Sequence, residues 1–129
     1  MRLAGAAALV ALAALGCARQ DARLQQQKEK LESLGATTAA IGDAWLSGSV
    51  SGTYTRTALQ QTLQLVEQER LAVAASPASL RDPRGAQLSQ SAEHLSRIIA
   101  ALDGDIGDAD PASARRNLAA IPIKPAAHR

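Results

Sequence analysis

Four aspartates lie close together in one short segment, and their density makes this segment the first candidate for chemistry. They are Asp103, Asp105, Asp108 and Asp110, and carboxylate oxygens are ligands that calcium prefers. An EF-hand loop beginning at Asp103 needs glycine at its sixth position and a bidentate acid at its twelfth, where the chain has Asp108 and Ala114. We therefore expect no metal here and predict that the aspartates lie at the cap and loop before the next helix, facing its positive end.

Other reactive side chains lack the partners that catalysis needs. His94 stands beside Glu93 without a second histidine or cysteine at ligand spacing, and His128 lies in the C-terminal tail. Covalent haem would need a Cys-x-x-Cys-His motif, and a serine nucleophile would need a glycine-serine-glycine elbow; the sequence has neither. Glu67 and Glu69 fall on different faces of one predicted helix. We therefore expect a protein that is not an enzyme, with no catalytic residues and no cofactor.

The two aromatic residues flank a turn rich in glycine and serine. Trp45 and Tyr54 are the only Trp and Tyr, and the chain has no Phe. Exposed together, they would form an anchor for a partner protein, because aromatic residues often carry the binding energy of an interface. Alternatively, they close the end of a helical core and pack against each other. We prefer the second interpretation, because no other large side chains can close that end, and keep the pair as a possible partner contact.

The chain opens with an apolar segment typical of exported proteins. Residues 1–16 carry one positive charge, Arg2, followed by an uninterrupted apolar run over residues 3–15. The run is shorter than the roughly 20 residues needed to span a bilayer, and it has the charged start and the length of a signal-peptide core. Small residues at Ala14 and Gly16 fit a signal-peptidase cleavage site.

The residues that end this segment, Ala14-Leu15-Gly16-Cys17, resemble the lipobox of bacterial lipoproteins, in which a small residue precedes a cysteine. The resemblance implies cleavage between Gly16 and Cys17, a diacylglyceryl group on the Cys17 thiol and acylation of the new N-terminus. Ala14 and Leu15 depart from the residues that the family prefers, so the resemblance depends on Gly16, Cys17 and the leader. The residue after the cysteine is Ala18. By resemblance, a lipoprotein that lacks aspartate at this position is directed to the outer membrane.

Two other interpretations of the leader remain open: an ordinary secretory signal cut at the same bond, and an uncleaved anchor helix. The cysteine count favours the lipoprotein, because Cys17 is the only cysteine and has no disulfide partner within the chain. Several acyl chains on this residue, at about 0.8 kcal/mol per buried methylene, would make membrane attachment effectively permanent.

Composition favours helices and disfavours nucleic acid as a partner. Hydrophobic residues make up 47% of the 129 residues but aromatic residues only 2%, so a core must come from Leu, Ile, Val and Ala, which suits closely packed helices. The net charge of +2 comes from basic and acidic residues that are mixed along the chain. A protein that binds nucleic acid would carry a basic patch and aromatic residues for stacking.

Apolar periodicity predicts three long helices and a short fourth. The first covers residues 21–45, and its polar N-terminal turns suggest a stalk; the second follows a cap at Ser49, Ser51 or Thr53 and runs to about residue 76. Residues 77–82 form a turn, the third helix starts at Pro83, and the fourth lies between Asp110-Pro111 and Pro122. The inward residues are predicted to be Leu24, Leu31, Leu34, Ile41 and Trp45, then Leu59, Leu63, Val66 and Val73, then Leu88, Ala92, Leu95, Ile99, Leu102 and Ile106, and last Ala114, Leu118 and Ile121. Arg70 shares the second pattern and is expected at its edge, with its stem packed and its charge in water.

These patterns predict an all-α protein, a small up-down helical bundle. Its parts are a signal peptide over residues 1–16, a lipidated N-terminus and tether over residues 17–22, the bundle over residues 23–121 and a mobile tail over residues 122–129. The expected function is that of a non-enzymatic accessory or interaction module of the cell envelope, which contacts a membrane through its lipid and an envelope protein, but no nucleic acid. A periplasmic bundle that binds a small apolar ligand in its core is the alternative, and an envelope enzyme would need a partner to complete its site.

Overall fold

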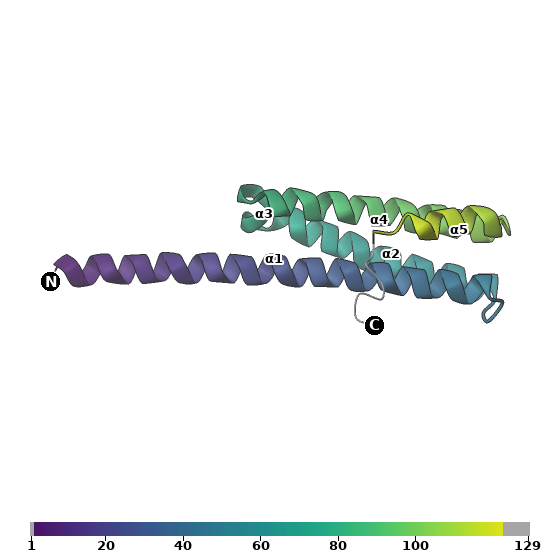
Figure 1. The fold of residues 1–129 in the computed structure, drawn as a ribbon, viewed down its shortest axis with the longest axis horizontal. Coiled ribbons are helices and arrows are strands. Elements are labelled where there is room, and N and C mark those ends of the chain that lie inside the picture. The colour runs from purple at the N-terminus through teal and green to yellow at the C-terminus, as the bar shows by residue number, and fades with distance from the viewer. Residues whose placement is uncertain (1, 123–129) are drawn as a thin grey trace.

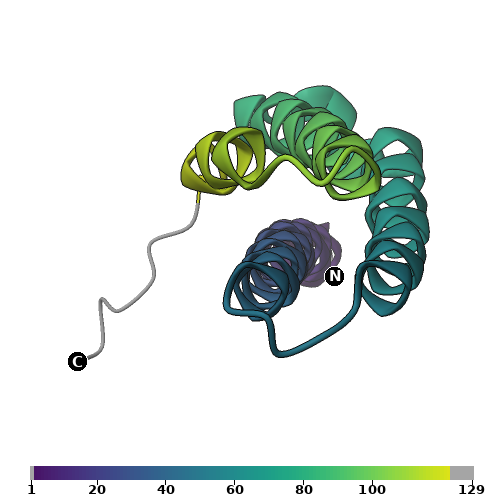
Figure 2. The ribbon, with the colours of Figure 1, turned by 90° about the vertical axis from the view of Figure 1, so that its right-hand side faces the viewer.

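The computed structural model describes residues 2–122, apart from the side chains of residues 2–15, Cys17 and Ala78. The described residues form five helices and no strand: α1 (Arg2–Leu46), α2 (Gly52–Ala75), α3 (Pro77–Arg81), α4 (Pro83–Gly107) and α5 (Pro111–Ala119). The chain runs up and down along α1, α2, α4 and α5 (Figure 1). Seen along the bundle axis, α4 lies between α2 and α5, and α1 faces this group (Figure 2). The prediction of an all-α bundle with three long helices and a short fourth is confirmed.

Side-chain caps begin three of the helices. Ser51 accepts a hydrogen bond from the backbone N–H of Tyr54 at 3.1 Å and starts α2. The carboxylates of Asp82 and Asp110 accept bonds from the N–H groups of Arg84 (3.0 Å) and Ser113 (3.1 Å), and a proline follows each cap. Proline suits the first helical position because no intrahelical partner is needed there. The predicted starts of α4 and α5 are therefore confirmed.

Two predictions about the helix limits are wrong. The turn expected at residues 77–82 contains a five-residue helix, α3, which can pack closely on α4 because position 85 is glycine: a Cβ there would lie 2.2 Å from the Cα of Ser79. The first helix does not begin near Asp21, because α1 continues from Arg2 through the predicted leader and tether. The alanines and leucines of the leader are good helix formers, which accounts for the continuity.

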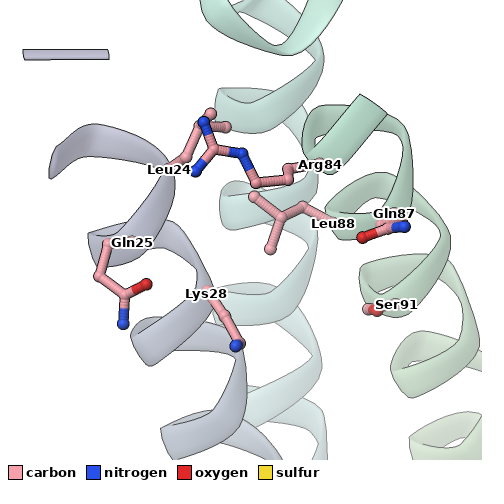
Figure 3. Close-up of a pocket in the computed structure, with 7 residues that line it drawn as sticks. All are labelled: Leu24, Gln25, Lys28, Arg84, Gln87, Leu88 and Ser91. Atoms are coloured by element: carbon pink, nitrogen blue, oxygen red, sulfur yellow. The ribbon is translucent and has the colours of Figure 1, made fainter. Parts of the chain in front are cut away.

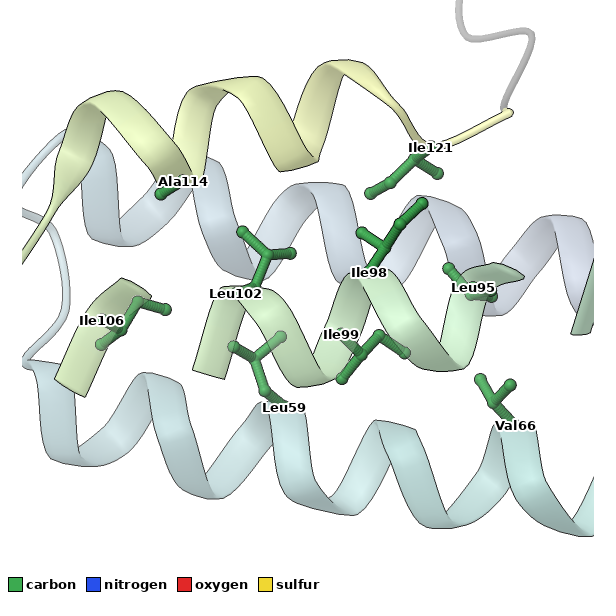
Figure 4. Close-up of a cluster of buried hydrophobic side chains, with 9 residues drawn as sticks. All are labelled: Leu59, Val66, Leu95, Ile98, Ile99, Leu102, Ile106, Ala114 and Ile121. Atoms are coloured by element: carbon green, nitrogen blue, oxygen red, sulfur yellow. The ribbon is translucent and has the colours of Figure 1, made fainter. Parts of the chain in front are cut away.

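The buried apolar side chains that the structure describes form two clusters along the bundle, which extend from Leu24 to Ile121. The larger cluster joins α2 and α4, with α5 packed over it (Figure 4). Its buried members are Leu59, Val66, Leu95, Ile98, Ile99, Leu102, Ile106, Ala114 and Ile121. The smaller cluster joins α1, α2 and α4 and comprises Leu24, Leu31, Val73, Leu88 and Ala92. Since α5 contributes only to the larger cluster, it covers only one half of the bundle.

The predicted stalk in α1 is wrong, because its polar turns pack against the bundle. Leu24 and Leu31 belong to the smaller cluster, and the intervening Gln27 is only 6% exposed. The predicted inward residues farther along α1 pack on the larger cluster. The part of α1 that extends past the other helices in Figure 1 comes before these turns.

Three threonines are buried between the helices at positions where apolar periodicity did not predict burial. Thr38 on α1 and Thr55 and Thr62 on α2 are buried, and each hydroxyl donates to the carbonyl four residues earlier at 2.7–2.8 Å. The hydroxyls are satisfied within their own helices, so burying them carries no unpaired donor. Leu63, which was predicted to face inward, is only partly buried, and Arg70 is partly buried as expected at the edge of the stripe.

Candidate functional site

Gly16 and Cys17, the predicted cleavage and lipidation residues, lie on α1 just before the bundle. Gly16 is exposed, while the side chain of Cys17 lies outside the described residues, as does the C-terminal tail beyond Pro122. The expected cleavage and acylation therefore stay predictions. What the structure describes is the bundle end next to these residues, and this end is the first candidate site.

A three-residue ion network fastens α1 to α4 at this end. Arg84, in the first turn of α4, donates to Asp21 of α1 at 2.5 Å and to the capping carboxylate of Asp82 at 2.6 Å. Hydrogen bonds from the side chain and then the backbone of Arg84 lower the pKa of Asp82. The bonds to Asp82 and Asp21 raise the pKa of Arg84, which keeps the guanidinium charged. The network fixes α1 only four residues after Cys17.

A surface groove of ≈ 260 Å³ lies between α1 and α4 beside this network. Figure 3 shows Arg84 reaching from α4 toward Leu24 of α1, while Gln25 and Lys28 lie farther along α1. The groove is lined by Leu24, Gln25, Lys28, Arg84, Gln87, Leu88 and Ser91. Leu24 and Leu88 are buried, whereas the amides, the hydroxyl and the two cations are exposed. The lining therefore combines two leucines with polar and cationic side chains.

The two aromatic residues at the opposite end have different surroundings. Trp45 is partly buried and packs against the larger core cluster. Tyr54 is 62% exposed, because the Ser51 cap sets the start of α2 so that Thr55, one residue later, turns inward. The interpretation that both aromatics close the core is therefore wrong for Tyr54. Their role as a partner contact stays a prediction.

The four aspartates connect helices. Asp103 of α4 accepts a hydrogen bond from Arg56 of α2 at 3.0 Å. Asp105 accepts from Ser113 Oγ at 2.7 Å and from Asn117 Nδ2 at 2.6 Å, both across the turn to α5. Asp108 is the residue at the C-terminal cap of α4, and Asp110 caps α5. Asp110 therefore confirms the predicted cap role for its own position, while the partners of Asp103 and Asp105 were not foreseen.

The histidine and the glutamates also make structural contacts. His94 is exposed, with Nε2 3.3 Å from the carbonyl oxygen of Ala120. Glu67 accepts hydrogen bonds from Arg70 at 2.8 Å and from Ser96 of α4 at 2.8 Å, and these bonds, Arg70 first, lower its pKa. Glu69 lies 3.8 Å from the ammonium of Lys30 on α1. The prediction that the two glutamates occupy different faces of α2 is confirmed.

These features define the chain as an antiparallel all-α bundle in which a short last helix covers one half. A scan against protein-family models, a search of curated proteins and a search of solved structures each returned no match. Within the described residues, no helix carries an apolar stretch long enough to cross a membrane. The same part of the chain contains no group of three His, Cys, Asp or Glu side chains that could hold a metal ion.

Proposed function

We propose that the protein is a bacterial lipoprotein, held at a membrane by acyl chains on Cys17, that serves as a non-enzymatic accessory or interaction module of the cell envelope. The observation that carries the proposal is the Gly16-Cys17 pair at the end of a charged and apolar leader. Ala18 in the next position supports the outer membrane, on its periplasmic face, as the location.

The arrangement of the core supports cleavage before Cys17. Among the side chains that the structure describes, the members of both core clusters lie between Leu24 and Ile121, so a mature chain that starts at Cys17 keeps all of these members. The Asp21–Arg84 ion pair also remains. A chain that starts at Cys17 therefore retains the described core, and Asp21, which forms this ion pair, lies about one helical turn after the cysteine.

The use made of the charged side chains supports an interaction role. Arg56 and Asp103 connect α2 to α4, and Glu67 connects α2 to Ser96 on α4. These groups stabilise helix pairs, and none of them lines the groove beside Arg84. We place the contact with an envelope protein at Tyr54, which is exposed at the end away from Cys17, with Trp45 of the same turn region as a possible second residue.

The test is the mass of the N-terminal peptide. The full-length chain and its Cys17→Ser variant are expressed in a bacterial host, and the peptide is recovered from the membrane fraction. We expect the mass of an acylated Cys17 in the wild type and an unlipidated chain in the variant. Ala18→Ser is the control, because it changes a neighbour while keeping the cysteine and should be acylated like the wild type. An unmodified Cys17 on protein released from the membrane would refute the proposal.

A further inference from the structure

Two of the most exposed large apolar side chains lie at the same end of the bundle. Leu80 on α3 is 81% exposed, and Leu71, in the last two turns of α2, is 59% exposed. The inner side of α3 is occupied by its close approach to Gly85 through Ser79, so Leu80 is left on the outside. A leucine that is this exposed contacts little of the bundle, so packing within the bundle does not explain why an apolar residue occupies this position.

This end of the bundle is the one next to Cys17. Figure 1 shows α3 at the end of the bundle from which the N-terminal part of α1 extends. The ion pair between Asp21 and Arg84 fixes α1 against the first turn of α4, which directly follows α3. Asp21 follows Cys17 by four residue steps of helix, a rise of about 6 Å. An acyl chain on Cys17 would therefore bring the membrane to the level of α3.

The charge at this end favours an anionic surface. The helix segments at this end carry four arginines, Arg19, Arg23, Arg81 and Arg84, and two aspartates, Asp21 and Asp82, and both aspartates are bound by Arg84. Arg19, Arg23 and Arg81 are exposed. Basic residues near a membrane are attracted to anionic headgroups, and the long stem of arginine lets its charge stay at the headgroups while a neighbouring apolar side chain enters the interface.

We propose that this end face of the bundle, formed by Leu80, Leu71, Arg81, Arg23 and Arg19, rests on the surface of an anionic membrane with Leu80 inserted at the interface. The inference rests on the proposed acylation of Cys17, which supplies the attachment. A lipid surface fits better than a second copy of the chain, because two such faces would bring arginines against arginines. The acyl chains hold the protein on the membrane, and the end face sets its orientation.

The experiment uses the anchored full chain labelled at one position. In an acylated protein the Cys17 sulfur is a thioether, so Leu80→Cys introduces the only free thiol, which is labelled with an environment-sensitive bimane. Ser49→Cys, in the turn at the opposite end, is the matched control. Both proteins are reconstituted in phosphatidylglycerol vesicles with bromine atoms in the upper acyl region, which quench a bimane that enters the interface. We expect about half or more of the emission at position 80 to be quenched, and none at position 49.

Charge is tested in the same vesicles. Arg81→Glu together with Arg23→Glu, in the Leu80→Cys chain, should reduce the quenching about two-fold or more, as should neutral phosphatidylcholine vesicles. An acylated Cys17 with position 80 unquenched overturns the inference and leaves the lipoprotein intact. A blue-shifted but unquenched bimane also overturns it, because a protein would then cover Leu80. An unmodified Cys17 in the mass spectrum refutes the proposed function, and the inference falls with it.

Discussion

Asp21 and Arg84, which are 63 positions apart in sequence, form an ion pair that fastens α1 to the first turn of α4. Arg84 is shared with Asp82, the cap of its own helix, so one guanidinium holds both the start of α4 and the neighbouring stretch of α1. The smaller core cluster begins at Leu24, three residues after Asp21. The pair therefore marks the point at which α1 joins the bundle.

The first prediction concerns this junction. Asp21→Asn should increase amide hydrogen exchange in residues 18–24 of α1, because the helix loses its ionic contact with α4 there. The midpoint of thermal unfolding should change little, since an exposed ion pair contributes weakly to global stability. Asp43→Asn, an exposed aspartate near the other end of α1, is the control. Equal exchange in the wild type and Asp21→Asn would show that the pair does not hold α1.

Two glycines of α4 should respond oppositely to alanine. A Cβ at Gly85 would lie 2.2 Å from the Cα and 2.4 Å from the carbonyl oxygen of Ser79. These are backbone atoms, so Gly85→Ala must displace α3 and should lower the free energy of unfolding by about 1–3 kcal/mol. Gly104→Ala adds a methyl with nothing within 4 Å. It should raise the same free energy by about 0.5–1 kcal/mol, because alanine is the better helix former.

Urea unfolding followed by circular dichroism measures both variants. The sign difference between them is the decisive result. If Gly85→Ala were as stable as Gly104→Ala, the close packing of α3 on α4 would not exist in solution.

Shortening a buried side chain of α4 should lower the free energy of unfolding far more than shortening an exposed side chain of α2. Ile99 is fully buried in the larger cluster, and Ile99→Ala should cost about 2–5 kcal/mol of unfolding free energy through lost burial and the cavity left behind. Leu65 is 50% exposed, and Leu65→Ala should change that free energy by less than about 0.5 kcal/mol. Denaturant midpoints of the two variants provide the comparison. Similar costs would contradict the inward direction of Ile99.

Acid should weaken the bundle partly through Glu67. Hydrogen bonds from Arg70 and Ser96 hold the pKa of Glu67 below its usual 4.5 in the folded chain. The folded carboxylate therefore binds fewer protons than the unfolded one, so its contribution to stability is full above pH 4.5 and is lost as the pH falls through the folded pKa. Glu67→Gln should lower the slope of unfolding free energy against pH between about pH 6 and pH 3. Arg70→Gln should do the same, because it removes the larger cause, and an unchanged slope in both variants would contradict the assignment.

The parts of the fold that the sequence predicted correctly depend on large apolar residues and on proline. Six buried residues recur on α4 at alternating spacings of four and three: Leu88, Ala92, Leu95, Ile99, Leu102 and Ile106. This repeat can bury its side chains on one face only as a helix. The pairs Asp82-Pro83 and Asp110-Pro111 likewise start helices in the structure, because both the cap and the proline act locally.

What the sequence could not predict depends on contacts between distant segments. The burial of Thr38 requires a hydroxyl that bonds within its own helix, which residue type alone does not reveal. The turn between α4 and α5 places Ala109 at φ 52°, an uncommon conformation for a residue other than glycine. The bonds of Asp105 to Ser113 and Asn117 form across that turn, so they could not be inferred from the spacing.

Because α1 is uninterrupted, it also fixes the distance between Cys17 and the opposite end of the bundle. Between Cys17 and Leu46 the helix has no interruption, and 29 residue steps correspond to about 44 Å. In a protein anchored at Cys17 and resting on its end face, the turn between Trp45 and Tyr54 would stand that far from the bilayer. The helix would then act as a rigid spacer of fixed length. A partner that binds Tyr54 would lie at a fixed distance from the membrane, whereas a flexible linker would let that distance vary.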